Sequence, residues 1–290
     1  VKHIKYEWGR ACDLFGLEQQ LERGCYEALL ICHNETSSGI TQDAEAIAEM
    51  CSRYNTSFIL DGITSIGGLP VYPKEWNVEA AAVGAQKCTA GPSGISAIAF
   101  NSKFYQRCKA IREQGDSNPM YYLDIISAHK KGSDDQTPWT PAINLAMGWA
   151  EALDFLKSEG LENRWNRCEK LSKCVQNLFQ DLGFDLLAEP FQRSNTVTAI
   201  LYPQGIDDKW RSDLKDSFNT QVIGAQGMPC KLQRHAKLGI VLALNQSALQ
   251  SFCRGDDARY LNRLCDYVRG FCTLGVQHYQ GVIVGAGLQV

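Results

Sequence analysis

Lys87 is the residue of this chain whose type and position are best suited to covalent chemistry. It lies in the stretch Gly84-Ala85-Gln86-Lys87-Cys88-Thr89-Ala90-Gly91-Pro92, directly after the apolar run 78–83. An apolar run that ends at Gly and Pro predicts a buried strand followed by a turn. At such a place the neutral amine of a lysine could attack a carbonyl carbon. The alternative is an ordinary lysine in a strand-to-loop turn, and spacing alone does not separate the two.

Asp61 is the second candidate, because it also ends a short apolar strand. Residues 57–60 precede it, and the Gly-containing stretch 62–68 follows. Open α/β sheets bind their ligands at the carboxyl ends of the strands. Both ionisable groups fit this rule, although an ordinary turn aspartate is again the alternative.

Strands and helices alternate around these two residues. Short apolar strands are predicted at 26–32, 57–60, 79–83 and 95–100, and 43–54 has the period of an amphipathic helix. The order strand, helix, strand predicts a βαβ unit and an α/β fold with a mixed, mostly parallel sheet flanked by helices. Residues 1–6 look like the middle of a strand. Later in the chain we predict helices at 102–113, from 142 to the break at Gly160, at 161–182 and at 260–271, and a strand at 196–201.

Length and composition limit the possible functions. A chain of 290 residues that is 44% hydrophobic predicts two domains, a large one over 1–158 and a smaller C-terminal α+β domain over 159–290. With a formal charge of −3 the chain has no excess of basic residues that would attract nucleic acid. No apolar run reaches the roughly 20 residues that span a bilayer. The 12 cysteines include no Cys-x-x-Cys pair and no zinc-like spacing, which predicts reduced thiols in a cytoplasmic protein without a metal site.

The order and spacing of six segments resemble the class V pyridoxal-phosphate-dependent aminotransferases, within them the alanine–glyoxylate and serine–glyoxylate group. The resemblance extends from near Val1 to about Gly239 and implies a fold-type I pyridoxal-phosphate-dependent transferase. The six segments are residues 33–39, 61–68, 84–87, 121–124, 137–141 and 160–165.

The resemblance implies a role for individual residues around the cofactor, pyridoxal 5′-phosphate. Lys87 matches the family's Schiff-base lysine, and Asp61 matches the acid that faces the pyridine nitrogen. Ile63 matches an apolar residue that packs on one face of the ring. Thr36 matches the hydroxyl beside the phenolic oxygen, and Gln86 matches the polar neighbour of the phosphate.

Three further residues are implied to act at the edges of the site. Thr137 or Thr140 resembles a threonine that reaches the phosphate of the neighbouring subunit, which implies a homodimer. Arg234 matches an arginine that binds the substrate carboxylate, a task that suits a planar guanidinium.

The implied reaction moves an amino group from alanine or serine to glyoxylate or a similar 2-oxo acid by a ping-pong mechanism. One alternative is another class V activity such as a cysteine desulfurase, for which Cys230 and Cys253 are the candidate reactive thiols. A second alternative is a non-catalytic, dimerising homologue. The peroxisome is the alternative compartment, although the end of the chain, residues 287–290, is not a peroxisomal address.

The resembled family carries an N-terminal segment that this sequence lacks. That segment supplies a Gly-Thr turn whose backbone amides cradle the phosphate, and an aromatic that stacks on the other face of the cofactor. Helix N-termini are natural anion sites. We therefore expect this chain, as written, to bind the cofactor weakly or to be inactive.

Overall fold

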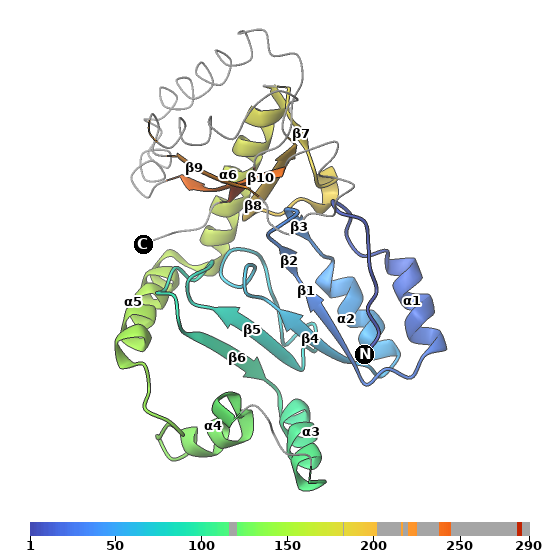
Figure 1. Ribbon diagram of the computed structural model, residues 1–290, viewed down its shortest axis with the longest axis vertical. Coiled ribbons are helices and arrows are strands. Elements are labelled where there is room, and N and C mark those ends of the chain that lie inside the picture. The colour runs from blue at the N-terminus through green and yellow to red at the C-terminus, as the bar shows by residue number, and fades with distance from the viewer. Residues whose placement is uncertain are drawn as a thin grey trace.

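Two larger β-sheets and one two-stranded hairpin organise the computed structural model, which describes residues 1–115, 121–181, 183–201, 216, 220–224, 238–244 and 283–285 (Figure 1). The first sheet has four strands in the order β1-β4-β5-β6, and the second has five in the order β7-β8-β11-β10-β9. The α/β class and the mostly parallel first sheet confirm the predicted fold.

The first sheet carries the strands that precede both candidate residues. β1 (Ala28–Cys32), β4 (Ser57–Asp61) and β5 (Ala80–Gly84) are parallel, and β6 (Ser96–Phe100) is antiparallel to β5. α2 (Ala44–Arg53) connects β1 to β4, and the carboxylate of Asp43 caps it by accepting from the Ala46 N–H at 3.0 Å. These elements begin and end within two residues of their predicted bounds.

Helices cover one face of this sheet with an apolar core. α1 (Leu14–Arg23) and α2 bury Leu17, Leu21 and Ile47 against Phe58 and Leu60 of β4. Residues 14, 17 and 21 follow a helical period, because a residue three or four positions on returns to the same helix face. The sequence therefore contains a helical pattern at α1, although our sequence analysis assigned no element to these residues.

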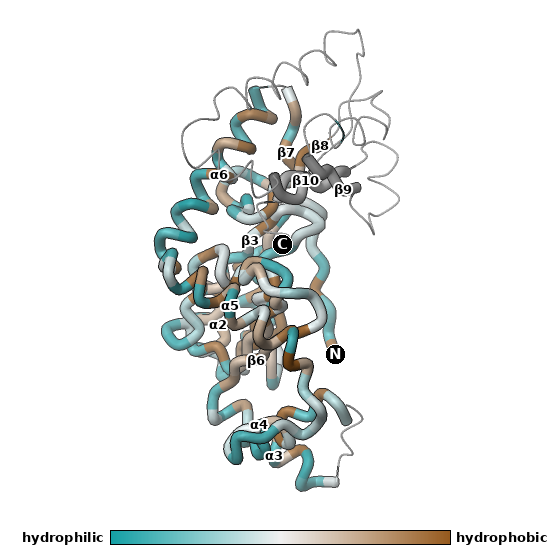
Figure 2. Tube along the Cα trace, turned by 90° about the vertical axis from the view of Figure 1, so that its left-hand side faces the viewer, coloured by the Kyte–Doolittle hydropathy of each residue, from teal (hydrophilic) through white to brown (hydrophobic). Residues whose placement is uncertain are grey.

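The other face of the sheet carries the side chain of Asp61. Cys32, Asp61, Ala82 and Ile98 are in register across the four strands, so their side chains leave the sheet on the same side. Ile98 of β6 and Leu30 of β1, at opposite edges of the sheet, are exposed by 42% and 70%. Figure 2 shows helices α2 and α5 on one side of the sheet and the N-terminus on the other.

The prediction of a strand at residues 1–6 is wrong, because residues 1–7 are irregular. Within the described part of the chain, no strand pairs with these residues. Instead the ammonium of Lys2 donates to the side chains of Gln20 and Tyr26. A strand pattern needs a neighbour that accepts its backbone hydrogen bonds, and sequence alone does not supply one.

The second sheet follows two long helices. α5 (Ile143–Glu159) ends at Gly160, which has the left-handed φ of +82°, and α6 (Leu161–Asp181) begins at once. α6 runs beside the second sheet, and its first turns lie next to the first sheet (Figure 1). The predicted division at 158/159 falls at this junction and stays a prediction.

The second sheet is mostly antiparallel. All of its strand pairs are antiparallel except the pair of β10 with β11, which is parallel. The predicted helix at 260–271 lies outside the described residues. In the described part of the chain, no helix combines the length and the apolar character needed to cross a membrane. The other elements are β2 (Asn34–Glu35), β3 (Ile40–Thr41), α3 (Ser102–Glu113), η1 (Tyr121–Leu123), α4 (Ile125–Gly132), β7 (Asp185–Leu186), η2 (Pro190–Gln192), β8 (Val197–Leu201), β9 (Thr220–Gly224), β10 (Leu238–Leu244) and β11 (Ile283–Gly285).

Candidate functional site

Asp61 and Lys87 follow neighbouring parallel strands. Asp61 is the last residue of β4 and pairs with Ala82 of β5, and Lys87 lies in the turn that follows β5. The Gly62 N–H continues the ladder by donating to the Ala82 carbonyl at 3.0 Å. Because both strands run in the same direction, both residues lie at the same carboxyl edge of the sheet.

Asp61 is half-buried, and one of its two carboxylate oxygens accepts a hydrogen bond from the chain. Its Oδ1 accepts a hydrogen bond from the Ile63 N–H at 3.0 Å, and the Asp61 carbonyl accepts from the His33 N–H at 3.0 Å. Burial, together with the nearby Glu35 and Asp61 carboxylates, raises the pKa of the adjacent Cys32 thiol to about 12. Within the described residues Oδ2 of Asp61 has no hydrogen-bond partner, so it can accept a bond from a ligand.

Lys87 projects from a turn whose other side is buried. Gln86 and Lys87 are exposed, whereas Ala85, Cys88 and Thr89 are buried. The Ala85 carbonyl closes the turn by accepting from the Gly91 N–H at 2.7 Å and from the Thr89 hydroxyl at 3.0 Å. In the described part of the chain the Lys87 amine has neither a hydrogen-bond nor an ion-pair partner, so it can react with a ligand.

Three distant residues hold the lysine turn, which we define as residues 85–91. The indole N–H of Trp149 donates to the Thr89 hydroxyl at 3.0 Å, and the guanidinium of Arg164 donates to the Cys88 carbonyl at 3.0 Å. The Cys88 thiol donates to the Thr64 carbonyl at 3.1 Å. None of these contacts was predicted from the sequence, because nothing local marks that the helix side chains of Trp149 and Arg164 reach a turn 60 and 76 residues away, or that the Thr64 carbonyl faces Cys88.

The loop after Asp61 packs directly on the lysine turn. A Cβ atom on Gly68 would lie 2.9 Å from the Cys88 sulfur and 2.6 Å from Cγ2 of Thr196. A Cβ atom on Gly84 would lie 3.4 Å from Cγ2 of Ile63 and 3.1 Å from Oε1 of Gln86. Glycine at these positions therefore lets the two loops approach, and the side chains of Ile63 and Gln86 both lie against Gly84.

Thr36 lies in the hairpin that follows β1 at the same edge of the sheet. It begins the turn between β2 and β3, and its side chain is half-buried. The preceding His33 is buried beside Trp76, with ring centroids 5.7 Å apart. Burial lowers the pKa of His33 to about 4, so its imidazole is neutral at pH 7. A neutral, enclosed imidazole suits packing better than proton transfer at the edge.

The other predicted residues are not brought to this edge. Thr137 and Thr140 are exposed in the loop before α5, where the Thr137 hydroxyl donates to the Trp139 carbonyl at 2.7 Å. In Figure 1 the segment between α4 and α5 lies away from the carboxyl end of β5. Arg234, Cys230 and Cys253 lie outside the described residues.

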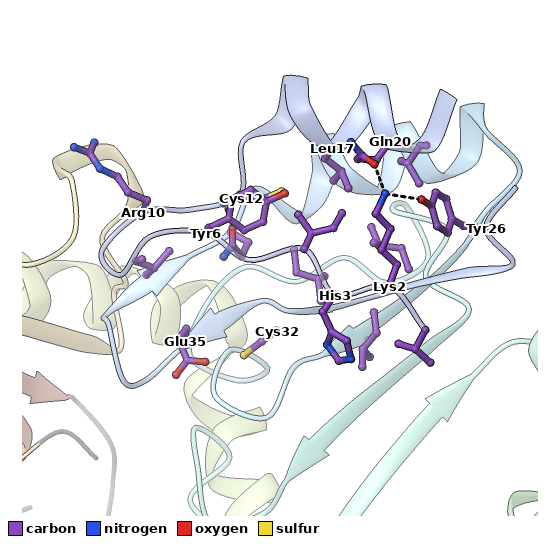
Figure 3. A pocket seen from close by; sticks show the side chains of 18 of the residues that line it. Lys2, His3, Tyr6, Arg10, Cys12, Leu17, Gln20, Tyr26, Cys32 and Glu35 are labelled. Atoms are coloured by element: carbon purple, nitrogen blue, oxygen red, sulfur yellow. Dashed lines mark hydrogen bonds between the residues drawn. The ribbon is translucent and has the colours of Figure 1, made fainter. Parts of the chain in front are cut away.

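A cavity lies elsewhere, between the N-terminal segment, α1 and β1 (Figure 3). It has a volume of about 890 Å³, and neither Asp61 nor Lys87 lines it. The polar groups at its wall are largely bonded to each other, since Tyr6 contacts the Cys12 thiol at 3.1 Å and Lys2 reaches Gln20. Burial also raises the pKa of the Cys12 thiol, which keeps it protonated. We therefore place the candidate site at the strand ends and not in this cavity.

Comparison with known proteins shows the family of the chain. The family model "Aminotransferase class-V" matches residues 1–254. An uncharacterised aminotransferase of Methanocaldococcus jannaschii is 34% identical over 242 residues, which are 82% of this chain and 62% of that protein. A serine–glyoxylate aminotransferase of Methylorubrum extorquens is 31% identical over 207 residues, which are 69% of this chain and 52% of that protein.

A solved structure extends the comparison to the fold. The crystal structure of an alanine–glyoxylate aminotransferase from Nostoc sp. superposes with a TM-score of 0.74 at 30% identity, over 82% of this chain and 62% of that one. This chain thus spans less than two thirds of the length of each of these relatives. Since the family model matches most of its 290 residues, the chain belongs to the class V aminotransferase family.

Proposed function

We propose that this chain carries the lysine and the acid of a pyridoxal-phosphate-dependent aminotransferase that moves an amino group from alanine or serine to glyoxylate or a similar 2-oxo acid. Members of the class V family typically use pyridoxal 5′-phosphate. The observation that carries the proposal is the position of Asp61 and Lys87 at the carboxyl ends of two adjacent parallel strands. The substrates follow from the relatives named for serine–glyoxylate and alanine–glyoxylate transfer.

The residues at this edge fit the cofactor. When bound, the cofactor supplies an aldehyde carbon for a primary amine and an electron-withdrawing ring. Lys87 has an exposed amine with no partner in the described chain, and Asp61 has a free carboxylate oxygen for a protonated ring nitrogen. The apolar side chain of Ile63 suits a ring face, and Gln86 and Thr36 have polar groups for the phosphate and the phenolic oxygen.

Lys87 has a second task in the proposed reaction. In its neutral form the amine would accept the proton from the substrate Cα, and as an ammonium it would deliver that proton to the carbon that had been the cofactor's aldehyde. The turn suits this task because its backbone is held on the buried side, while the long side chain of Lys87 is exposed and can move.

The remaining assignments concern a second subunit and the substrate carboxylate. We assign Thr137 or Thr140 to the phosphate site of a partner in a homodimer, because their loop lies away from the strand ends of their own chain. Arg234 is our candidate for the substrate carboxylate, on the resemblance alone. We retain the cytoplasm as the compartment, with the peroxisome as the alternative.

A trapping experiment tests the proposal. The chain is incubated with pyridoxal 5′-phosphate and reduced with borohydride, and mass spectrometry then locates the pyridoxyl group. Borohydride makes even a weakly populated adduct permanent. We expect the label on Lys87, its loss in Lys87→Ala, and its retention in the control Lys130→Ala, which alters an exposed lysine of α4.

Formation of glycine from glyoxylate, with alanine or serine as the amino donor, is measured alongside. Loss of this transfer in Lys87→Ala supports catalysis by Lys87. Label scattered over surface lysines, with Lys87 no more reactive than Lys130, would refute the assignment. A desulfurase would instead release sulfur from cysteine, and the cysteine desulfurase of Thermococcus onnurineus shares only the fold with this chain, at 16% identity.

A further inference from the structure

Arg164 is a buried cation whose guanidinium joins α6 to the lysine turn. Only 9% of its side chain is exposed, and Nη2 donates to the Cys88 carbonyl at 3.0 Å, 76 residues earlier in the chain. Nη1 lies 3.2 Å from Oε2 of Glu159. A buried charge needs such partners, because its desolvation is otherwise costly. The arginine is therefore held in place on both sides.

Glu159 fixes the direction in which Arg164 points. Its carboxylate also accepts two hydrogen bonds from Arg167, at 2.6 Å from Nε and 2.9 Å from Nη2. Burial favours the neutral acid, but the bonds and charges of Arg167 and Arg164 outweigh it and hold the pKa of Glu159 below its usual value. The carboxylate at the end of α5 is thus ionised, and it directs one edge of the Arg164 guanidinium toward Cys88.

Among the three contacts that hold the lysine turn, only the hydrogen bond from Arg164 to the Cys88 carbonyl has a charged donor. Trp149 and Thr64 hold the same turn through neutral groups, at the Thr89 hydroxyl and the Cys88 thiol. A hydrogen bond from a guanidinium is about twice as strong as a neutral one. Cys88 directly follows Lys87, so a bond that fixes the carbonyl of Cys88 restrains the backbone beside the lysine Cα.

We propose that Arg164 is a positioning residue for Lys87, acting through the backbone of Cys88 and touching neither cofactor nor substrate. The inference deepens the proposed function and rests on it for the role of the amine. It also links the start of α6 to the site, because a shift of this helix moves the donor that holds the turn.

The test compares three variants of the whole chain. Arg164→Gln removes the charge, and Arg164→Lys keeps it on a single nitrogen atom, which cannot reach Glu159 and Cys88 with the planar geometry of a guanidinium. Arg167→Gln is the matched control: it stands three residues further along α6 and loses two bonds to the same Glu159, which lies at the end of α5 and not in the lysine turn. Circular dichroism first verifies folding, and Arg164→Lys carries the test if Arg164→Gln does not fold.

The first readout needs no cofactor. Hydrogen exchange of a peptide that covers residues 85–91 reports the Gly91 N–H, which closes the turn. We expect Arg164→Gln to accelerate its exchange by about tenfold. Arg164→Lys should show a smaller increase, and Arg167→Gln should stay within about twofold of the unsubstituted chain. A peptide from β4 serves as the internal reference for global stability.

The second readout is the rate at which Lys87 captures pyridoxal 5′-phosphate, followed by visible absorbance. In this step the amine nitrogen bonds to the aldehyde carbon and one water leaves. We expect about a tenfold slower rate in Arg164→Gln and partial recovery in Arg164→Lys. A merely structural role predicts equal exchange in the turn and in β4, and an unchanged capture rate once folding is matched.

The outcomes separate this inference from the proposed function. If Arg164→Gln leaves turn exchange and capture rate within about twofold, or if Arg167→Gln matches it, the positioning role is wrong. If the unsubstituted chain never captures the cofactor on Lys87, the proposed function fails. Turn exchange then still decides whether Arg164 holds the backbone of Cys88.

Discussion

The side-chain amide of Asn34 donates a hydrogen bond of 3.1 Å to the hydroxyl of Thr196, 162 residues further along the chain. The same amide donates to the carbonyl and the hydroxyl of Thr64, at 3.2 Å and 3.1 Å, and its oxygen accepts from Thr41 at 2.8 Å. Asn34 is 1% exposed, so this network lies in the interior. It joins the hairpin after β1, the loop after Asp61 and the entry to β8.

Substitution of Asn34 should destabilise the protein strongly. Asn34→Ala removes four hydrogen bonds of the interior, including the only one that the Thr41 hydroxyl makes among the described residues, and is expected to lower the free energy of unfolding by about 3 kcal/mol. Asn34→Asp keeps the shape but replaces the donor with an oxygen that faces other oxygen atoms, so it should cost at least as much. Urea denaturation measures both. The control is Asn163→Ala on the exposed face of α6, with a change within about 0.5 kcal/mol; an equal effect at both sites would contradict the network.

Gly68→Ala tests the contact between the two loops of the site. The added Cβ would meet the Cys88 sulfur and the Thr196 methyl at less than 3.0 Å, so we expect a loss of about 1–3 kcal/mol in the free energy of unfolding. Capture of pyridoxal 5′-phosphate by Lys87 should also slow. Gly132→Ala in α4 is the control, since nothing lies within 4 Å of the new atom and helix propensity favours alanine. A neutral Gly68→Ala would show that the loops do not touch.

Ala90→Gly should stabilise the lysine turn. Ala90 has a φ of +55°, in the left-handed region that disfavours a Cβ atom. Relief of this strain exceeds the entropy that glycine adds to the unfolded chain, and the expected gain is about 0.5–1 kcal/mol. The same substitution at Ala146, exposed inside α5, should instead cost about 1 kcal/mol. Thermal denaturation measures both changes: the midpoint should rise in Ala90→Gly and fall in Ala146→Gly.

His33 makes stability depend on pH in acid. Burial lowers its pKa to about 4, below the unfolded value of 6.5, so the unfolded chain binds more protons between these values. The contribution is complete above pH 6.5, and up to about 3 kcal/mol of stability is lost as the pH falls from 6.5 to 4. Denaturant midpoints at a series of pH values measure this slope. His33→Phe should reduce the slope, whereas His3→Gln, at an exposed histidine, should leave it unchanged.

Asp61→Asn isolates the charge of the acid. The asparagine oxygen can still accept from the Ile63 N–H, so the loop should stay in place and the free energy of unfolding should change by less than about 1 kcal/mol. Without the negative charge the ring nitrogen of the cofactor loses its partner, and transfer from alanine or serine to glyoxylate should fall by about 100-fold or more. Undiminished transfer by a folded Asp61→Asn would remove Asp61 from the proposed site.

Local patterns in the sequence were sufficient to predict most elements of the first sheet and the helices around it. α3 has its predicted bounds, and β4 and β5 lie within one residue of theirs, because apolar runs bounded by turn residues specify short strands. The hairpin of β2 and β3 was missed, since two-residue strands carry no readable period. Residues 1–6 were misread because a strand also needs a neighbour.

The sequence by itself determined the two strand ends that bear Asp61 and Lys87, since each depends on residues adjacent in the chain. The order of strands and helices also predicted a mostly parallel sheet. Tertiary structure alone decided that β4 and β5 are neighbours, that Gly68 meets Cys88, and that Arg164 and Asn34 reach across 76 and 162 residues. Such contacts depend on how distant segments pack together, and a polar side chain buried by that packing must find its partner there. No local pattern in the chain encodes which partner that is.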